Sequence, residues 1–308
     1  MRKRVSIIGS GNVGATTAQL IVHSGIADVV LFDIVEGMPQ GKALDLAEAC
    51  PLWNSSSTIK GTNNYSDTAG SDIVVITAGL ARKPGMSRND LFHANADIVR
   101  CVCIEIAKIS PNAIIIVVTN PMDVMAQLAW KATEFSCKHV MGMGGLLDAA
   151  RLAAFLSWEL NVSPEDIEAL VLGGHGDEMV PLPRFTTVKG IPVTELLSKK
   201  RIDSLIERTR SGGAEIVAFL KSGSAYYAPA ASTFQMIKSI LLDEKRLLPC
   251  AAYLNGEYGM KDIYMGVPVI LGKEGAEKIV EVKLTKEERL QFRKSCASVR
   301  KLIKKLSI

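Results

Sequence analysis

One histidine of this chain is distinguished by the glycines on both of its sides. Four histidines occur, His23, His93, His139 and His175, and the last lies in Gly174-His175-Gly176 after an apolar run. Glycine neighbours let a substrate and another backbone segment come close. An imidazole, whose pKa lies near neutrality, donates and accepts protons. His175 is therefore a candidate acid/base, with Asp148 and Asp177 as the carboxylates nearest in sequence that could orient it. A turn histidine bonded to backbone is the alternative.

Arginines form a second candidate group. Residues 79–88 read Gly-Leu-Ala-Arg-Lys-Pro-Gly-Met-Ser-Arg, so Arg82 and Arg88 lie in a loop bracketed by glycine and proline. Guanidinium groups bind carboxylates through two parallel hydrogen bonds, and such a loop could close over an acidic substrate. A solvated basic loop is the alternative. Arg151 lies three residues after Asp148, on the same face of an expected helix, where a surface ion pair is the alternative.

A glycine-rich turn near the N-terminus reads Gly9-Ser10-Gly11-Asn12-Val13-Gly14. It follows the apolar run 5–8 and precedes a helix-compatible stretch at 15–22, and Asp33 closes a second apolar run 19 positions after Gly14. These glycines permit a tight turn, close approach of a diphosphate and close helix–strand packing, and the helix N-terminus faces the phosphates. Asp33 would accept hydrogen bonds from ribose hydroxyls and repel a 2′-phosphate, which favours NAD over NADP. A plain strand–helix turn is the alternative.

Apolar, β-branched runs alternate with helix-compatible segments in the first half of the chain. Runs 5–8, 29–33, 72–77, 113–119 and 140–143 are expected to be buried parallel strands, and 42–49 and 95–109 to be helices. This alternation predicts an α/β fold with a doubly wound parallel sheet of the Rossmann type. The glycine turn, Asp33, Thr77-Ala78-Gly79 and Thr119-Asn120-Pro121 follow the strands, at the edge where such sheets bind ligands.

The second half of the chain has a mixed α+β pattern. We expect helices at 148–160, 203–221 and 228–242, and a strand at 168–172 that leads to His175. Antiparallel strands are expected at 186–191 and at 267–271, the latter resuming at 276–284. A boundary near Gly144-Gly145, without a flexible linker, divides the chain into an NAD-binding Rossmann domain (1–144) and a substrate-binding, catalytic lobe (145–308).

Composition excludes several classes of protein. The 308 residues are 48% hydrophobic and 22% charged, as in ordinary globular proteins. A net charge of +4 is too small and scattered to indicate nucleic acid. The basic segment 289–305 has apolar residues at helical spacing, which favours an amphipathic helix on the body over a membrane or nucleic-acid face. No apolar run reaches the length of a membrane span, so neither membrane nor nucleic acid is an expected partner.

The six cysteines favour a cytoplasmic protein. None forms a Cys-x-x-Cys pair, and none is near a histidine at metal-ligand spacing. We therefore expect reduced, buried thiols and no metal site. The N-terminal Met-Arg-Lys-Arg runs directly into a short strand rather than into a signal peptide.

The chain as a whole resembles the lactate/malate dehydrogenase superfamily, and within it the NAD-dependent malate dehydrogenases whose sequences are lactate-dehydrogenase-like. The resemblance covers essentially the full length. The motifs that carry it are the turn 9–14, Asp33, the loop 82–88, Val118-Thr119-Asn120-Pro121, Leu147-Asp148-Ala149-Ala150-Arg151, residues 173–177 and residues 223–229.

The resemblance implies a role for each matching residue. His175 matches the acid/base, Asp148 the carboxylate that orients it, and Arg151 the arginine that binds the substrate's C1 carboxylate. Arg88 matches the lid arginine that polarises the reacting carbonyl, and Asn120 the asparagine beside substrate and nicotinamide. The implied cofactor-binding positions are Gly9, Gly11, Asn12, Val13, Gly14, Asp33, Thr77, Gly79, Asn95, Val118 and Asn120.

Within this family, the residue at position 82 indicates which substrate the resemblance implies. Malate dehydrogenases of this family have arginine there, paired with the second carboxylate of oxaloacetate, whereas lactate dehydrogenases typically have glutamine. A buried, unpaired guanidinium facing pyruvate would be costly. A dehydrogenase for lactate or another 2-hydroxy acid, and a catalytically silent NAD-binding protein, are the alternatives. Family relatives are dimers or tetramers, and a homotetramer is expected here, with a dimer as the alternative. Ala149 and Gly144 stand where the family usually has serine and alanine.

Overall fold

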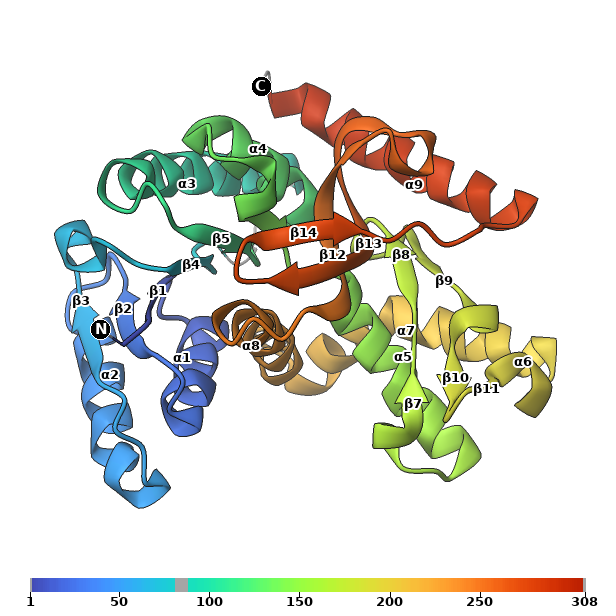
Figure 1. Cartoon of the computed structure of the whole chain (residues 1–308), viewed down its shortest axis with the longest axis horizontal. Helices are drawn as coiled ribbons and strands as arrows, with labels where there is room; N and C mark the ends of the chain where they lie inside the picture. Colours follow the sequence, from blue (N-terminus) through green and yellow to red (C-terminus); the bar gives the residue numbers. More distant parts are fainter. Residues whose placement is uncertain (1, 81–87, 307–308) are drawn as a thin grey trace.

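The parallel half of one large sheet forms the frame of the molecule. The structure is a computed structural model that describes residues 2–80 and 88–306 (Figure 1). Six parallel strands have the order β3-β2-β1-β4-β5-β6. Their bounds are β1 Arg4–Ile8, β2 Asp28–Phe32, β3 Ile59–Thr62, β4 Ile73–Ile76, β5 Ile114–Val117 and β6 Val140–Gly142. Strand order reverses between β1 and β4, which confirms the doubly wound arrangement and creates a ligand-binding crevice at their carboxyl ends.

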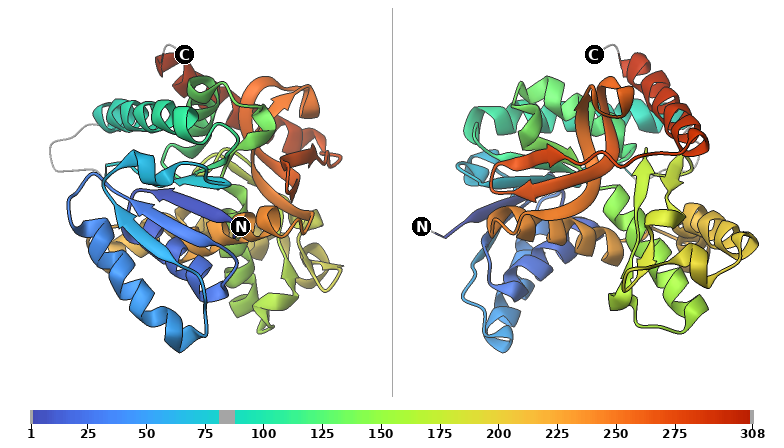
Figure 2. Two further views of the ribbon diagram at one scale, coloured as in Figure 1. Left: turned by 60° about the vertical axis from the view of Figure 1, so that its left-hand side comes forward. Right: turned by 45° about the vertical axis from the view of Figure 1, so that its right-hand side comes forward.

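Helices cover both faces of this sheet. In Figure 1 and in both views of Figure 2, α3 and α4 lie on one side of the strands and α1 and α2 on the other. The four helices are α1 (Asn12–Ser24), α2 (Met38–Ala49), α3 (Arg88–Ile109) and α4 (Met122–Thr133). Because both faces are covered, the strands are apolar without alternation, and all four residues of β4 and of β5 are buried.

The second half of the chain adds antiparallel strands to the same sheet. Beyond β6 the order continues β12-β13-β8-β9, and β14 also pairs with β13. Strands β11, β10 and β7 form a separate small antiparallel sheet. The strands are β7 Ile167–Glu168, β8 Val171–Gly173, β9 Met179–Pro181, β10 Thr187–Val188, β11 Ile191–Pro192, β12 Arg246–Asn255, β13 Lys261–Gly272 and β14 Gly275–Ile279.

Five helices accompany these strands in the described part of the chain. They are α5 (Gly145–Leu160), α6 (Val193–Leu196), α7 (Lys199–Leu220), α8 (Tyr227–Leu241) and α9 (Lys286–Ile303). Helix α8 packs against α1, and α5 against α7. Short 3₁₀ turns lie at Cys50–Trp53, Tyr65–Thr68, Cys137–His139, Pro164–Asp166, Pro183–Phe185, Glu257–Gly259 and Lys304–Leu306.

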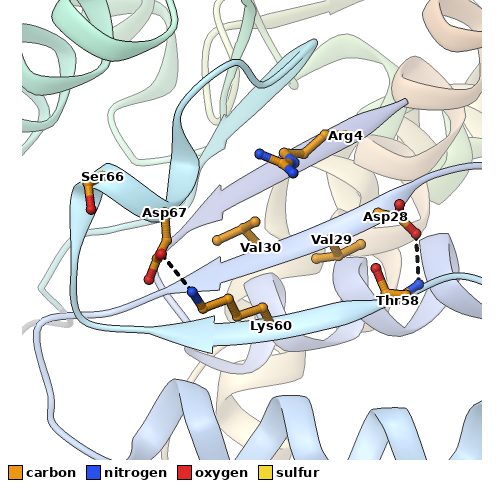
Figure 3. A pocket seen from close by; sticks show the side chains of 8 residues that line it. All are labelled: Arg4, Asp28, Val29, Val30, Thr58, Lys60, Ser66 and Asp67. Carbon is orange, nitrogen blue, oxygen red and sulfur yellow. Dashed lines mark hydrogen bonds and ion pairs between the residues drawn. The ribbon is translucent and has the colours of Figure 1, made fainter. Parts of the chain in front are cut away.

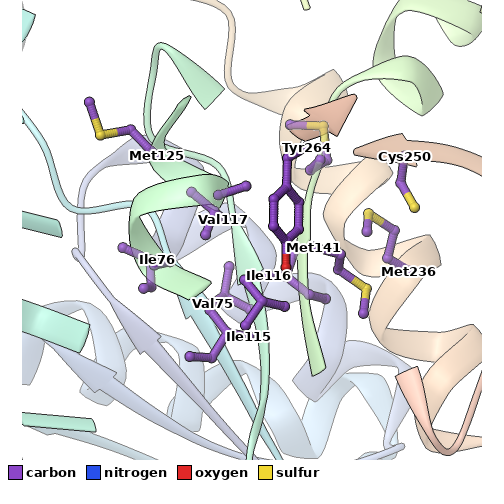
Figure 4. Close-up of a cluster of buried hydrophobic side chains, with 14 of the residues drawn as sticks. Val75, Ile76, Ile115, Ile116, Val117, Met125, Met141, Met236, Cys250 and Tyr264 are labelled. Atoms are coloured by element: carbon purple, nitrogen blue, oxygen red, sulfur yellow. The ribbon is translucent and has the colours of Figure 1, made fainter. Parts of the chain in front are cut away.

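One hydrophobic core extends across the expected domain boundary. Buried Ile115 and Ile116 of the parallel sheet belong to the same cluster as Met236 of α8 and Tyr264 of β13 (Figure 4). Strand β6 pairs with β5 on one side and with β12 on the other. The two halves therefore share a sheet and a core, and the division at residues 144 and 145 stays a prediction. A second cluster, which includes Leu152, lies beneath the small sheet.

Several predicted strands differ in the structure. The expected strand 168–172 is split between β7 and β8, which belong to different sheets. The expected strand 186–191 is a hairpin of β10 and β11, because Lys189 and Gly190 both have positive φ, 47° and 88°. The predicted strand 276–284 ends at Ile279. Strands β3, β9 and β12 are not among the predicted strands.

The C-terminal amphipathic helix forms as its spacing predicts. Helix α9 begins with a capping box in which Thr285 and Glu288 exchange side chain–backbone bonds, and Phe292, Ser295, Cys296 and Val299 are its buried residues. All six cysteines are free, but the expectation that they are all buried was wrong, because Cys101 is exposed and Cys137 half-buried. Within the described ranges, no helix is both long and apolar enough to cross a membrane.

Candidate active site

The glycine turn joins β1 to α1 as the motif predicts. Gly9 has φ +108°, and a Cβ on Gly14 would lie 1.9 Å from the Gly9 carbonyl oxygen, so both positions require glycine. A Cβ on Gly11 would meet no described atom within 4 Å. Helix α1 starts here without a side-chain cap among the described residues. Free N–H groups beside an open approach at Gly11 fit the diphosphate of a dinucleotide.

Asp33 follows β2 and is fixed against this turn. Its Oδ2 accepts hydrogen bonds from the Ser10 N–H (2.7 Å) and the Ser10 hydroxyl (3.0 Å), and its Oδ1 accepts one from the Val35 N–H (3.0 Å). Partial burial raises the pKa of Asp33, but these hydrogen bonds outweigh it, and the net pKa is lowered. An ionised, oriented carboxylate beside the turn fits hydrogen bonding to a ribose.

Side chains tie the ends of β1, β4 and β5 together near the switch point. The Thr77 hydroxyl donates to the Gly9 carbonyl (2.8 Å). Asn95 Oδ1 accepts from the Leu80 N–H (2.7 Å), and its Nδ2 donates to the Asn120 carbonyl (3.1 Å). Gly79 is tight, because a Cβ there would lie 2.9 Å from a Thr119 methyl group. The buried Asn95 therefore joins the two backbone segments that follow β4 and β5.

His175 and Asp148 meet at the end of the turn after β8. His175 Nδ1 lies 2.9 Å from Asp148 Oδ2, and the Asp148 side chain, on the first turn of α5, is only 1% exposed. The sequence offers two carboxylates that could orient His175, and the one in contact with its ring is Asp148. Asp177 is exposed, and no bond between it and His175 occurs among the described residues. An Nδ1–H donated to the carboxylate leaves Nε2 as the atom that can exchange a proton with a substrate.

Charge around His175 favours its protonated form. Burial lowers the pKa of His175, but the carboxylates of Asp148 and Asp123 raise it, and the net pKa is raised despite an opposing contribution from Arg151. A raised pKa favours the imidazolium, which is the form that can donate a proton to a substrate oxygen.

Arg151 lies beside the same carboxylate, one helical turn along α5. Its Nη1 is 3.6 Å from Asp148 Oδ1, which is an ion pair but too long for a hydrogen bond. Arg151 Nε and Asp148 Oδ1 are buried without a hydrogen-bond partner in the described part of the chain. Burial lowers the pKa of Arg151 from its usual high value, with Asp148 acting against this. A buried guanidinium with an unused N–H is the donor that a small carboxylate binds.

Two arginines predicted for the site, Arg82 and Arg88, fall wholly or partly outside the described residues. Arg82 lies outside the described residues, and Arg88 begins α3 with a side chain that is also outside the description. The other histidines lie elsewhere. His23 packs edge-on against Trp53, His93 is exposed beside Phe92, and His139 is half-buried at the start of β6.

Sequence reasoning missed Asp123 and Ser295. Asp123 Oδ2 accepts a hydrogen bond from the His175 N–H (2.8 Å), and the Ser295 hydroxyl of α9 accepts one from the Gly174 N–H (2.8 Å). Burial raises the pKa of Asp123 to about 6, although the His175 N–H and the imidazole charge act against it. Asp123 lies three residues after Asn120, a predicted site residue, and this proximity could have identified Asp123 as a candidate. For Ser295, 121 residues from Gly174, the sequence contains no such signal.

A separate hollow lies at the opposite ends of the strands. Arg4, Asp28 and Thr58 line it near the beginnings of β1, β2 and β3, together with Lys60 and Asp67 (Figure 3). Its polar groups bond one another: Lys60 Nζ lies 2.6 Å from Asp67 Oδ1, and the Thr58 N–H donates to Asp28 Oδ1. Because it lies at the beginnings of these strands, the hollow is separate from the crevice at their carboxyl ends, where the glycine turn and Asp33 lie.

Comparison with known proteins agrees with this geometry. Residues 3–142 match the lactate/malate dehydrogenase NAD-binding domain, and residues 146–307 match the lactate/malate dehydrogenase α/β C-terminal domain. The chain is 56% identical over 299 residues to a malate dehydrogenase of Roseiflexus sp., covering 97% of each chain.

Solved structures of the family have the same fold. A malate dehydrogenase of Cryptosporidium parvum superimposes with a TM-score of 0.97 at 44% identity, covering 100% of this chain and 99% of the other. A lactate dehydrogenase of the same organism, in complex with lactic acid and NAD, superimposes with a TM-score of 0.96 at 40% identity, covering 100% and 98%. The chain therefore belongs to the lactate/malate dehydrogenase family and is an NAD-dependent oxidoreductase.

Proposed function

We propose that this enzyme is a malate dehydrogenase that interconverts (S)-malate and oxaloacetate. The observation that carries the proposal is the cluster of His175 and Arg151 around the buried carboxylate of Asp148, which combines a proton donor with a carboxylate-binding guanidinium. The 56% identity to a malate dehydrogenase over nearly the full length supports a dicarboxylate as the substrate. Arg82 supports it further, because a second guanidinium matches a second carboxylate.

Each residue of the site has a distinct task in this mechanism. When bound, NAD supplies the hydride donor or acceptor for the substrate carbon. Residues Gly9–Gly14 would hold its diphosphate and Asp33 its adenosine ribose, with Thr77, Gly79, Asn95 and Val118 shaping the crevice. Arg151 binds the C1 carboxylate and Arg82 the other one. Arg88 polarises the carbonyl, and Asn120 contacts the substrate.

His175 moves the proton in both directions. During reduction, protonated His175 donates from Nε2 to the developing alkoxide oxygen, and during oxidation neutral His175 removes the proton of the malate hydroxyl. Asp148 stabilises the imidazolium and keeps the ring oriented. Holding the reacting groups in place and stabilising the oxyanion supply most of the catalytic effect.

Comparing two substrates tests the proposal. NADH oxidation is measured with oxaloacetate and with pyruvate at equal concentrations. We expect kcat/KM to favour oxaloacetate by about three decades, roughly 4 kcal/mol. Comparable rates, or a preference for pyruvate, would support a lactate dehydrogenase instead. NADH binding without turnover of either substrate would support a catalytically silent protein.

The assembly and location are part of the same proposal. We infer a homotetramer, with a dimer as the alternative, from the resemblance to a family of dimers and tetramers. The exposed large apolar side chains Leu52, Trp158 and Phe219, 65–83% exposed, are compatible with contacts between subunits. Light scattering coupled to size-exclusion chromatography measures the mass directly. Free cysteines in the described residues are compatible with a reducing cytoplasm.

A further inference from the structure

Two successive backbone N–H groups at the active site are held by side chains from two other helices. The Gly174 N–H donates to the Ser295 hydroxyl of α9, and the His175 N–H donates to Asp123 Oδ2 of α4, each at 2.8 Å. Ser295 is 0% exposed and Asp123 4%. Both acceptors therefore act away from water, where a hydrogen bond restrains its partner most strongly.

The backbone around His175 is rich in glycine and needs these two hydrogen bonds to hold it in place. Strand β8 ends at Gly173, whose φ is +88°, and Gly176 has φ +109°. His175 thus lies between two backbone positions that favour glycine, on a segment whose own conformational preferences restrain it weakly. A Cβ on Gly174 would lie 3.0 Å from a Val299 methyl and 3.4 Å from Asp123 Oδ2, so this glycine fits closely between α9 and α4.

Asp123 also acts on His175 through charge. Together with Asp148, it raises the pKa of His175, and its own Oδ1 is buried without a hydrogen-bond partner among the described residues. The charged and titratable groups that face this pair are Asp148 and Arg151 on α5 and the buried Cys296 on α9. An isosteric amide at position 123 would keep an oxygen acceptor for the His175 N–H but remove the charge.

We propose that Asp123 and Ser295 are positioning residues for His175, which hold its backbone from α4 and α9, and that the charge of Asp123 also acts on the imidazole. The proposal rests on the proposed acid/base role of His175. Because both residues act through the backbone or at a distance, neither needs to touch substrate. The C-terminal helix thereby becomes part of the catalytic apparatus rather than only a cover for the sheet.

The first test removes the Ser295 acceptor. Ser295→Ala is compared with Ser239→Ala, which deletes another fully buried helical hydroxyl, bonded at 2.8 Å to the Leu271 carbonyl. We expect kcat/KM for oxaloacetate to fall about tenfold or more in Ser295→Ala, because small displacements of a catalytic group are costly. NADH affinity and the Ser239→Ala activity should stay near wild type. Equal activity of the two variants would overturn the clamp.

The second test separates geometry from charge at position 123. The imidazole pKa of His175 is measured by NMR of ¹⁵N-histidine-labelled enzyme without cofactor, with His175→Asn identifying the resonance. Asp123→Asn and Asp123→Ala should both lower this pKa, and Asp123→Ala should lose about tenfold more kcat/KM, because it also lacks the acceptor. An unchanged His175 pKa in Asp123→Asn would overturn the electrostatic part of the proposal.

The direction of the pH effect gives an independent check. A lower His175 pKa depletes the proton donor, so the high-pH limb of oxaloacetate reduction should move to lower pH in Asp123→Asn. The low-pH limb of malate oxidation, which needs neutral His175, should move the same way. If wild-type enzyme turned over neither substrate, the proposed function would fail, while the NMR titration would still test whether Asp123 acts on His175.

Discussion

Asp148 Oδ2 lies 2.9 Å from His175 Nδ1, and the other oxygen of the same carboxylate lies 3.6 Å from Arg151 Nη1. One buried carboxylate thus adjoins both the proton-transfer group and the proposed anion-binding group. This arrangement restrains the ring orientation of His175 and brings the proposed proton donor and the proposed carboxylate-binding group to the same carboxylate of α5.

Replacing Asp148 by asparagine should therefore cost most of the activity. Asp148→Asn removes the charge that stabilises the imidazolium and can reverse the hydrogen bond to Nδ1. We expect kcat for oxaloacetate reduction to fall about 10²-fold or more, with NADH affinity retained. Steady-state kinetics measures the loss. Asp177→Asn is the matched control, because Asp177 is exposed two residues after His175. Near-normal kcat in Asp148→Asn would refute the assignment.

The glycine turn predicts different effects on stability for two alanine substitutions that should both weaken NADH binding. In Gly14→Ala, the new Cβ would lie 1.9 Å from the Gly9 carbonyl oxygen, so the turn must shift and both thermal stability and NADH binding should decline. In Gly11→Ala, the new Cβ meets no described atom within 4 Å. This variant should keep the wild-type Tm but bind NADH about tenfold more weakly, or roughly 1.4 kcal/mol, because the methyl group occupies the approach to the helix N-terminus.

Thermal unfolding and NADH fluorescence titration distinguish these outcomes. If Gly11→Ala bound NADH as tightly as wild type while Gly14→Ala also folded and bound normally, the diphosphate would have to bind elsewhere in the crevice.

Asp123 should make the stability of the enzyme depend on pH. Its pKa is raised to about 6 in the folded protein from a usual value of 3.8. The contribution of the protonated form to stability is therefore complete below about pH 4 and is lost as the pH rises through about 6. Between these two pH values, the free energy of unfolding of wild type should fall by up to about 3 kcal/mol relative to that of Asp123→Asn. Urea unfolding of both proteins at pH 4.5, 5.5 and 7 measures the difference between their free energies of unfolding. A difference that did not change with pH would contradict the prediction.

This stability cost has a functional counterpart. A buried carboxylate that is ionised above pH 6 is unfavourable for folding, but in that form it stabilises the protonated imidazole beside it. Asp123→Asn is therefore expected to be more stable than wild type at neutral pH and less suited to donate a proton. Such an exchange of stability for function is common at active sites.

The parallel half of the fold could be predicted because its strands are buried on both faces. Runs such as Ile73–Ile76 and Ile114–Val117 are continuously apolar and short, which is typical of strands covered by helices on both sides. Strand β3, Ile59–Thr62, contains a lysine and a glycine and lies at the edge of the sheet, where burial imposes little pattern. Strand β12 contains Pro249, which argues against a central strand although it pairs opposite Pro268 of β13.

The site was predictable where function requires a local motif, and unpredictable where tertiary contacts supply the partner. The glycine turn and Asp33 are recognisable within one strand–helix–strand unit. The bond between His175 and Asp148 spans 27 residues, and its choice over Asp177 depends on the packing of α5. The contact between Gly174 and Ser295 spans 121 residues. Only the folded chain brings these groups together.

Arg82 carries the prediction about substrate choice. We expect Arg82→Gln to lower kcat/KM for oxaloacetate by about 10²-fold, because a charge-assisted pair to the second carboxylate is lost. The same change should raise activity with pyruvate, since an unpaired guanidinium would no longer disfavour a substrate that lacks the second carboxylate. Arg151, which we propose binds the carboxylate common to both substrates, provides the contrast: Arg151→Gln should lower kcat/KM for both substrates alike. Kinetics with oxaloacetate and pyruvate for the two variants measures this. If the oxaloacetate-to-pyruvate ratio were the same in Arg82→Gln as in wild type, another residue would have to read the second carboxylate.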